Sequence, residues 1–269
     1  MPLRPLIFLT NDDGIASPGL MAAARAVLGL GDLLVVAPSI QQTAMGRSFR
    51  GRKDAMMEPI AFEVDGHAIR AFHAEGSPAT VVRHALQVLC RERMPDLLIS
   101  GINYGENVGS SITASGTVGA AIEAASRGIP ALAVALQVHP DDFLHHGEQD
   151  WTAAEHFLRQ FAQMRLGATL PHDVDLLKID VPDTATPDTP WRLSRLSRQR
   201  YFEMVLETPS LESRLGDGRI FVDVDHASLE PDSDIHALAV DRVVAVTPLS
   251  LDATSRADFG DILRALSNL

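Results

Sequence analysis

The stretch LIFLTNDDG (Leu6–Gly14), near the amino terminus of this 269-residue chain, decides the fold. A short apolar run leads directly into a polar turn that contains two adjacent carboxylates, Asp12 and Asp13. Such a run is typical of a strand buried on both faces of a parallel sheet, and the turn marks the carboxyl end of that strand. The stretch therefore predicts an open α/β sheet whose ligand-binding edge begins at the two carboxylates.

Short apolar strands and helical segments alternate after this stretch. We expect helices at Met21–Leu28, Pro78–Arg93, Ser115–Arg127 and Trp151–Met164, and strands at Leu33–Ala37, Asp96–Ser100, Ala131–Leu136 and Leu176–Ile179. A hairpin with strands Ile60–Val64 and Ala68–Phe72 is expected to interrupt the series. The order predicts an α/β fold with a three-layer, Rossmann-like and largely parallel sheet, connected by right-handed crossovers.

The regular pattern ends in a segment rich in Pro, Thr and Asp at residues 182–190. We expect a Rossmann-like catalytic core at residues 1–182 and a divergent arm or oligomerisation segment at residues 183–242. A strand and a helix at residues 243–269 are expected to return to the core. The arm is expected because residues 193–225 are more charged and show no clear helical or strand period.

The composition excludes several classes of partner. With 46% hydrophobic and 22% charged residues, the chain has enough apolar material to build a core. A net charge of −12 opposes binding to nucleic-acid polymers and to anionic membranes, whereas a small phosphorylated ligand needs only a local anion site. The single cysteine, Cys90, excludes an intrachain disulfide, and no apolar run is long enough to span a membrane. We expect a cytoplasmic protein.

Asp12 and Asp13 are the first candidates for chemistry. Adjacent carboxylates repel each other unless a positive group lies beside them, and a divalent cation would remove that repulsion. A plain turn, with one Asp capping a helix and the other solvated, is the alternative, and it is the interpretation we favour for the loop pair at residues 141–142. Thr43 and Asn103 follow later strands and should converge on the same edge of the sheet. Such oxygen ligands favour Mg²⁺ or Mn²⁺ over a thiolate-bound zinc.

The segment Gly101–Thr113 is expected to be a Gly- and Asn-rich loop with exposed backbone amides. It has neither the Lys of a Walker A loop nor the glycine spacing of a dinucleotide fingerprint. The sequence therefore gives little reason to expect binding of a nucleoside triphosphate or of NAD. Asn107 lies within it and is a candidate for binding phosphate. The adjacent histidines at residues 145–146 are interpreted as solvated loop residues and not as metal ligands.

Ser115, Gly116 and Thr117 open a helix made of small residues. Two hydroxyl groups and several unpaired backbone N–H groups at a helix N-terminus would form a cradle for a phosphate group. An ordinary Ser or Thr N-cap is the alternative interpretation. The chain lacks a Gly-x-Ser-x-Gly elbow, and the turn Asn11–Gly14 lacks the Asp-x-Asp spacing of aspartyl-phosphate enzymes, so covalent catalysis is unsupported.

These motifs, taken in order, resemble the SurE family, the stationary-phase survival nucleotidases. The resemblance rests on Thr10–Gly14 with Pro18-Gly19, Val36–Pro38, Ser100–Asn103 with Gly105 and Asn107, and Ser115–Val118, with fainter matches at Gly76–Pro78 and Val246–Leu249. It implies a Rossmann-like 5′/3′-nucleotidase that uses Mg²⁺ or Mn²⁺, one ion per subunit, and that forms a homodimer or homotetramer. The family's metal ligands fall on Asp12, Asp13, Thr43 and Asn103, where Thr43 replaces the usual Ser.

The resulting hypothesis is hydrolysis of nucleoside 5′- and 3′-monophosphates at a site where Asp12 and Asp13 are catalytic. Ser115, Gly116, Thr117 and Asn107 would bind the phosphate oxygens and stabilise the transition state. The identity of the general base stays open: it is either one of the two carboxylates or a hydroxide activated by the cation. Two alternatives also remain open: a metal-dependent phosphatase of another small substrate or of polyphosphate, and a non-catalytic receiver-like module that binds a cation.

Overall fold

The computed structural model describes residues 3–139, 142 and 146–267. The helices are α1 (Pro18–Val27), α2 (Pro78–Val88), α3 (Gly116–Ala125), α4 (Thr152–Gly167) and α5 (Phe259–Ser267), with a 3-10 turn at Gly109–Thr113 and a π-helical turn at His236–Val240. The main-sheet strands are β1 (Leu6–Thr10), β2 (Asp32–Pro38), β3 (Glu58–Ile60), β6 (Arg70–Ala74), β7 (Leu97–Tyr104), β8 (Ala131–Leu136), β9 (Leu176–Val181), β10 (Trp191–Leu193) and β13 (Val244–Leu249). Two short ribbons pair β4 (Glu63–Val64) with β5 (His67–Ala68), and β11 (Phe202–Val205) with β12 (Arg219–Val222).

The main sheet has the order β10-β13-β9-β8-β7-β1-β2-β6-β3. The six central strands, β9, β8, β7, β1, β2 and β6, are parallel to one another. At the two ends of this group, β3 pairs antiparallel with β6, and β13 pairs antiparallel with β9. The chain passes from β1 outward to β2 and β6, then returns to β7 on the other side of β1. The topological switch point therefore lies between β1 and β7, where ligands bind in open α/β sheets.

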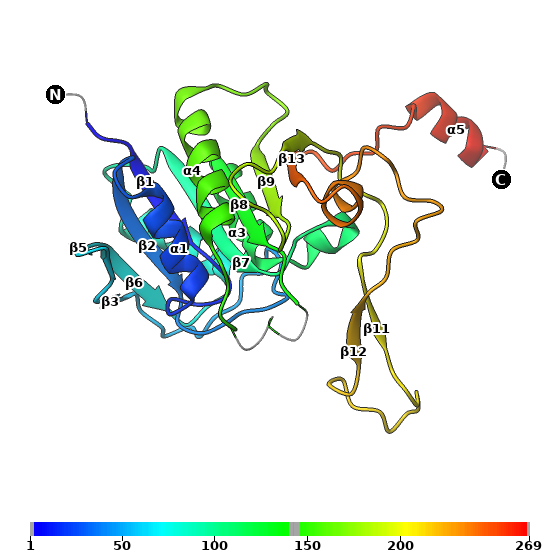
Figure 1. The fold of residues 1–269 in the computed structure, drawn as a ribbon, viewed down its shortest axis with the longest axis horizontal. Coiled ribbons are helices and arrows are strands. Elements are labelled where there is room, and N and C mark those ends of the chain that lie inside the picture. The colour runs from blue at the N-terminus through cyan, green and yellow to red at the C-terminus, as the bar shows by residue number, and fades with distance from the viewer. Residues whose placement is uncertain (1–2, 140–141, 143–145, 268–269) are drawn as a thin grey trace.

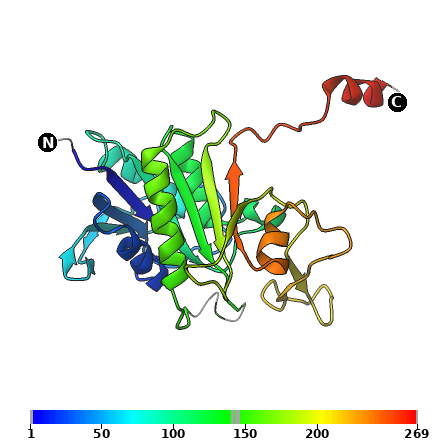
Figure 2. The ribbon, with the colours of Figure 1, turned by 45° about the horizontal axis from the view of Figure 1, so that its top comes forward.

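Side chains of β1 show why the sheet is covered on both faces. Ile7 and Leu9 join the core cluster that contains α1 and α4, whereas Phe8 joins the cluster that contains α2 and α3. All three side chains are fully buried. Because successive strand residues point to opposite faces, a continuous apolar run requires a helical layer on each side. Figure 2 shows α4 across one face of the sheet and α3 behind it, which confirms the predicted three-layer α/β architecture.

Strand β7 differs from the sequence-based expectation. The sequence predicted a strand that ends at Ser100 and a loop from Gly101, but β7 continues to Tyr104 after a register shift between Ser100 and Asn103. Gly101 has φ +129°, and a Cβ there would lie 2.2 Å from the carbonyl oxygen of Val134. Only glycine allows this close approach, and pairing with β8 then resumes beyond it.

The predicted hairpin at residues 60–72 is only partly correct. Residues 63–64 and 67–68 form the small ribbon β4–β5, but β6 leaves it and pairs parallel with β2 in the main sheet. The residues before this ribbon form β3, which pairs with the other edge of β6. The spacing of apolar residues within a segment predicts that the segment forms a strand, but it does not show which distant strand will be its parallel partner.

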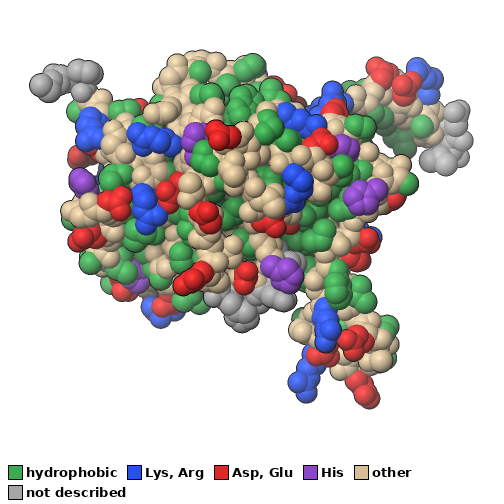
Figure 3. All heavy atoms as spheres, in the orientation of Figure 1, with side chains coloured by type: hydrophobic (Ala, Val, Ile, Leu, Met, Phe, Trp, Pro, Cys, Tyr) green, Lys and Arg blue, Asp and Glu red, His purple; other side chains and the backbone are tan. Residues whose placement is uncertain are grey.

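The carboxyl-terminal third contributes to the main sheet and also extends away from it. β10 and β13 extend the main sheet, whereas the ribbon β11–β12 projects from the body as an arm (Figure 1). Figure 3 shows hydrophobic side chains beside cationic and acidic ones on this arm. Helix α5 has no buried residue and lies apart from the body (Figure 2), so its predicted return to the core is wrong for the single chain. Among the described residues, no helix is both long and apolar enough to cross a membrane.

Candidate functional site

A pocket of about 350 Å³ lies at the carboxyl ends of β1 and β7, at the switch point of the sheet. Its lining combines the carboxylates after β1, the loop after β2, the end of β7 and the N-terminus of α3. The arm contributes Phe202 and Ile220 to the same pocket. Of the residues predicted for the site, the pocket is lined by Asp12, Asp13, Thr43, Asn103, Asn107 and Ser115. Segments far apart in the sequence thus meet around one small volume.

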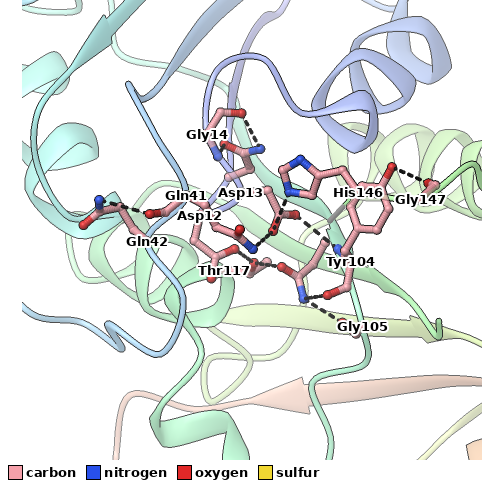
Figure 4. A network of polar contacts seen from close by, with 12 residues as sticks. Asp12, Asp13, Gly14, Gln41, Gln42, Tyr104, Gly105, Thr117, His146 and Gly147 are labelled. Carbon is pink, nitrogen blue, oxygen red and sulfur yellow. Dashed lines mark hydrogen bonds and ion pairs between the residues drawn. The ribbon is translucent and has the colours of Figure 1, made fainter. Parts of the chain in front are cut away.

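Asp12 is held between β1 and α3. Its carboxylate accepts a hydrogen bond from the hydroxyl of Thr117, which is completely buried (Figure 4). A Cβ on Gly116 would lie 2.7 Å from Asp12 Oδ2, so glycine is needed for the helix to approach this closely. Burial, followed by the charge of Asp13, raises the pKa of Asp12 to about 7, although Thr117 favours the ionised form. Repulsion between the two buried carboxylates therefore destabilises their ionised forms unless a cation lies beside them.

Asp13 faces a different set of groups. The backbone N–H of Tyr104 donates to Asp13 Oδ2 at 3.2 Å, and Gln41 Nε2 donates to Oδ1 at 3.4 Å. His146 Nε2 lies 3.8 Å from Oδ1, and the His146 ring is stacked against Tyr104 with centroids 4.9 Å apart. The interaction with the Asp13 carboxylate raises the pKa of the His146 imidazole. Asp13 is therefore oriented by the end of β7 and by the loop that carries His146 (Figure 4).

The amide group of Asn103 has a defined orientation. Its Nδ2 donates to the carbonyl oxygens of Gly105 at 2.6 Å and of Tyr104 at 3.2 Å. Its Oδ1 therefore faces the other way and accepts from the Thr117 hydroxyl at 3.1 Å. Since the same hydroxyl, which has a single proton, also contacts Asp12, the structure joins Asp12 and Asn103 through one buried side chain, and both residues line the pocket.

Thr43 lies on the opposite wall, in the loop after β2. Its side chain is exposed and lines the pocket, next to Ala44, which has φ +58°. The loop is anchored three residues later, where Gly46 N donates to the carbonyl oxygen of Ala114 at 2.8 Å. Arg47 extends the anchor through two hydrogen bonds, of 2.8 and 3.0 Å, to Glu123 of α3. Helix α3 thus holds both the loop of Thr43 and the carboxylate of Asp12.

The donor set fits a hard divalent cation. Asp12 and Asp13 are 7% and 6% exposed, and in the described part of the chain no Lys or Arg lies within ion-pair distance of either. The described residues also contain no group of three or more His, Cys, Asp and Glu side chains suited to a metal ion. Neutral oxygens must therefore complete the set, and Thr43 and Asn103 provide a hydroxyl and an amide oxygen at this pocket.

The predicted phosphate-binding residues take several positions. Ser115 lines the pocket, but its hydroxyl oxygen accepts from the N–H of Val118 at 3.0 Å, so it serves as the N-cap of α3. Thr117 and Gly116 are buried against Asp12. Asn107 lines the pocket, and its backbone N–H donates to the buried carboxylate of Asp180 at 2.6 Å. The N-terminus of α3 still lies at the pocket, where its dipole favours an anion.

Sequence reasoning missed several residues that line the pocket or contact its carboxylates. His146 was interpreted as a solvated loop residue, yet its ring nitrogen faces Asp13, while the neighbouring histidine lies outside the described residues. Phe202 and Ile220 come from the arm, and neither belongs to a recognisable motif. No local signal identifies these three residues, because their chain segments meet the pocket only through the tertiary fold.

Glu106 is a buried acid at this pocket, with 4% of its surface exposed. Burial raises the pKa of Glu106 to about 7, although Tyr201 and Gln137 favour its ionised form. Tyr201 is also buried, accepts a hydrogen bond from Gln137 Nε2 at 3.2 Å, and directly precedes the arm residue Phe202. Glu106 therefore lies where the loop after β7 meets the base of the arm. The Gly- and Asn-rich pattern gave no indication of a buried acid here.

The fold and the pocket together define a class: a three-layer α/β protein with a hard-oxygen site at the switch point of a parallel sheet. Residues 7–203 match the family model described as Survival protein SurE. The chain therefore belongs to the SurE family, as its motifs predicted.

Similar proteins support this assignment over nearly the whole chain. A protein of Thermococcus gammatolerans named 5′-nucleotidase SurE is 40% identical, and the match covers 97% of this chain and 95% of that protein. A protein of Methanocella arvoryzae with the same name is 39% identical, with 93% of each chain covered. The crystal structure of the SurE protein from Aquifex aeolicus has a TM-score of 0.73 and 25% identity, and covers 98% of this chain and 99% of that one.

The raised pKa of Glu106 predicts a pH-dependent effect on stability. Between pH 4.5 and about 7 the folded protein keeps a proton that the unfolded chain has lost, so this group lowers the free energy of unfolding as the pH rises. Glu106→Gln removes the effect. Its free energy of unfolding, measured by urea denaturation in EDTA, should gain about 3 kcal/mol relative to wild type between pH 4.5 and pH 8. The exposed Glu92→Gln is the matched control, with a constant difference expected; a constant difference for Glu106→Gln would contradict the prediction.

Proposed function

We propose that this protein is a nucleotidase that hydrolyses nucleoside 5′- and 3′-monophosphates to the nucleoside and phosphate with one divalent metal ion per subunit. The observation that carries the proposal is the shared contact of Asp12 and Asn103 with the Thr117 hydroxyl, which brings a carboxylate and an amide oxygen to one pocket. The relatives named 5′-nucleotidase SurE support the same activity.

The residues that would hold the ion, Mg²⁺ or Mn²⁺, are Asp12, Asp13, Thr43 and Asn103. When bound, such an ion supplies charge neutralisation and polarises a phosphate oxygen. Thr117 and Gly116 keep Asp12 in place, and Tyr104 and Gln41 orient Asp13.

The N-terminus of α3 has the polarity required for phosphate. Ser115, Gly116 and Thr117 begin the helix at the pocket, and Asn107 lies on its opposite rim. In the proposed reaction the N–H groups that begin α3 and the Asn107 side chain bind the phosphate oxygens that the ion leaves free, and they stabilise the negative charge of the transition state. The Thr117 hydroxyl meanwhile stays bonded to Asp12 and Asn103. One carboxylate oxygen of Asp12 or Asp13 would accept the proton of the attacking water. His146 helps to orient Asp13 from the side remote from α3.

Metal removal tests the proposed reaction. Phosphate release from a panel of nucleoside monophosphates should fall by at least about 100-fold in EDTA and recover with Mn²⁺, because two packed carboxylates then lose the cation that neutralises them. Asp12→Asn should lose both Mn²⁺ binding, measured by calorimetry, and turnover. The control Asp258→Asn changes an exposed carboxylate outside the pocket and should keep both. Turnover that survives EDTA would refute metal dependence, and release only from non-nucleotide phosphates would refute the substrate class.

The arm should determine affinity for the nucleoside. Phe202 and Ile220 form an apolar wall opposite the polar floor, which suits the face of a base. Phe202→Ala should raise KM for nucleoside monophosphates by about tenfold, because stacking on an aromatic ring is lost, with a smaller change in kcat. Steady-state kinetics with glycerol phosphate, which has no base, should show no such change. Met204→Ala lies on the same strand but outside the pocket and is the control; an equal effect of both variants would contradict a base-binding wall.

We also propose that the protein forms a homodimer or homotetramer through the arm and α5. Exposed apolar residues at helical spacing, Phe259, Ile262, Leu263 and Leu266, form one side of α5. The arm adds Met204, Val205, Leu211, Leu215 and Phe221. Apolar faces of this kind are rarely left in water.

Sedimentation should test this self-association. The wild-type chain should have the mass of a dimer or tetramer at micromolar concentration, and Phe259→Glu/Leu263→Glu should shift it toward the monomer, because buried charge opposes the contact. Arg264→Glu reverses a charge on the opposite side of the same helix, where Arg264 pairs with Asp261, and should leave the mass unchanged. A wild-type monomer would refute the proposal.

The proposed setting is the cytoplasm, with neither a membrane nor a nucleic-acid polymer as partner. The buried Cys90 thiol and the net charge of −12 support this setting.

A further inference from the structure

A second cavity, of about 420 Å³, lies beside the carboxyl end of β6, near the edge of the main sheet. It shares no lining residue with the candidate functional site. One wall is a face of α2, and the opposite wall is the loop at residues 49–57, with the end of β6 between them. We call this cavity the basic cavity, and nothing in the proposed reaction uses it.

The two walls bring cations together from separate elements. On α2 the lining residues Thr80, Arg83, His84 and Gln87 recur at helical spacing, so one face of the helix points into the cavity. Arg50, Arg52 and Lys53 line the loop side. Four permanently charged cations and one carboxylate, Glu75, therefore line this volume. The balance is opposite to that of the whole chain, in which 35 acidic residues outnumber 23 Lys and Arg residues.

Most of these cations are not neutralised by the protein itself. Arg52 alone forms ion pairs, with Asp54 at 3.0 Å and with Glu75 at 3.4 Å. In the part of the chain that the structure describes, the side chains of Arg50 and Lys53 have no carboxylate partner. The guanidinium group of Arg83 lies over the ring of Phe49, 4.8 Å from its centroid, and no described carboxylate forms an ion pair with it. Like charges gathered around a concave surface repel one another unless an anion lies between them.

Part of the lining is apolar. Phe49, Met56, Met57 and Val81 face the same volume, and Met56 is 73% exposed. A purely inorganic anion would leave this surface in water, whereas a ligand with a phosphate group and an apolar or aromatic part would contact both kinds of wall. Guanidinium groups bind phosphate through paired N–H donors, and a cavity of this size accommodates a small organic molecule.

We propose that the basic cavity is a second ligand site that binds a small organic phosphate, separate from the metal-dependent site. The loop that follows β2 belongs to both sites, since it lines the first at Thr43 and the second from Phe49 onward. The inference depends only on the cation arrangement and holds whether or not the protein hydrolyses nucleotides.

Calorimetric titration of the full chain with adenosine 5′-diphosphate tests this site. The probe carries two phosphate groups and an aromatic base. EDTA removes divalent metal ions from the first site, and low salt keeps the charge interactions of the basic cavity strong. Arg50→Glu/Arg83→Glu should raise Kd by at least about tenfold, because two charge-assisted hydrogen-bonding partners become repulsive. Inorganic pyrophosphate should bind the wild-type chain more weakly than the nucleotide, because it cannot contact the apolar wall.

Matched variants locate the binding. Arg91→Glu makes the same arginine-to-glutamate change at one exposed position outside the cavity and should leave Kd unchanged. Asp12→Asn damages the first site and should also leave Kd unchanged. Equal urea midpoints for the variants would show that folding is intact. The proposal is overturned if the wild-type chain does not bind the probe, if Arg91→Glu weakens binding as much as the cavity variant, or if Asp12→Asn abolishes it.

Discussion

The burial of two adjacent carboxylates at the end of β1 is the constraint on which the rest of the site depends. Asp12 and Asp13 are almost completely enclosed, and burial together with mutual repulsion shifts the pKa of Asp12 to about 7. Such a pair persists only if the surroundings supply hydrogen bonds and leave room for a compensating charge. Thr117 supplies the hydrogen bond, and the adjoining pocket leaves the room.

Helix α3 connects the parts of the site. Its N-terminus approaches Asp12 because Gly116 has no side chain, its second residue joins Asp12 to Asn103, and Glu123 near its other end binds Arg47 of the loop that carries Thr43. One helix therefore sets the separation of three segments that are remote in sequence. Fixed separations of this kind suit the proposed metal site, in which several oxygens would have to lie at short and similar distances from one ion.

Charge is distributed unevenly over this acidic protein. The candidate functional site gathers carboxylates and suits a cation that in turn attracts phosphate, whereas the basic cavity gathers uncompensated arginine and lysine side chains. Both arrangements are local exceptions to a chain with a net charge of −12. Net charge excludes long polyanions as partners, but it says little about a small anion that meets only a few side chains.

The sequence by itself determined the fold class, the strand that carries the carboxylates and the helix that faces them, because apolar periodicity and turn residues are local properties. It also indicated the oxygens of Asp12, Asp13, Thr43 and Asn103, since parallel strands place their carboxyl ends at one edge. Only the tertiary structure decided that β7 continues past Gly101, that β6 joins the main sheet, and that α5 lies apart from the core. The positions of Glu106 and Phe202 at the pocket, and of His146 beside Asp13, were decided in the same way. Contacts between segments far apart in the chain produce no periodic pattern of apolar residues in either segment. Only the packing of the folded chain therefore determines them.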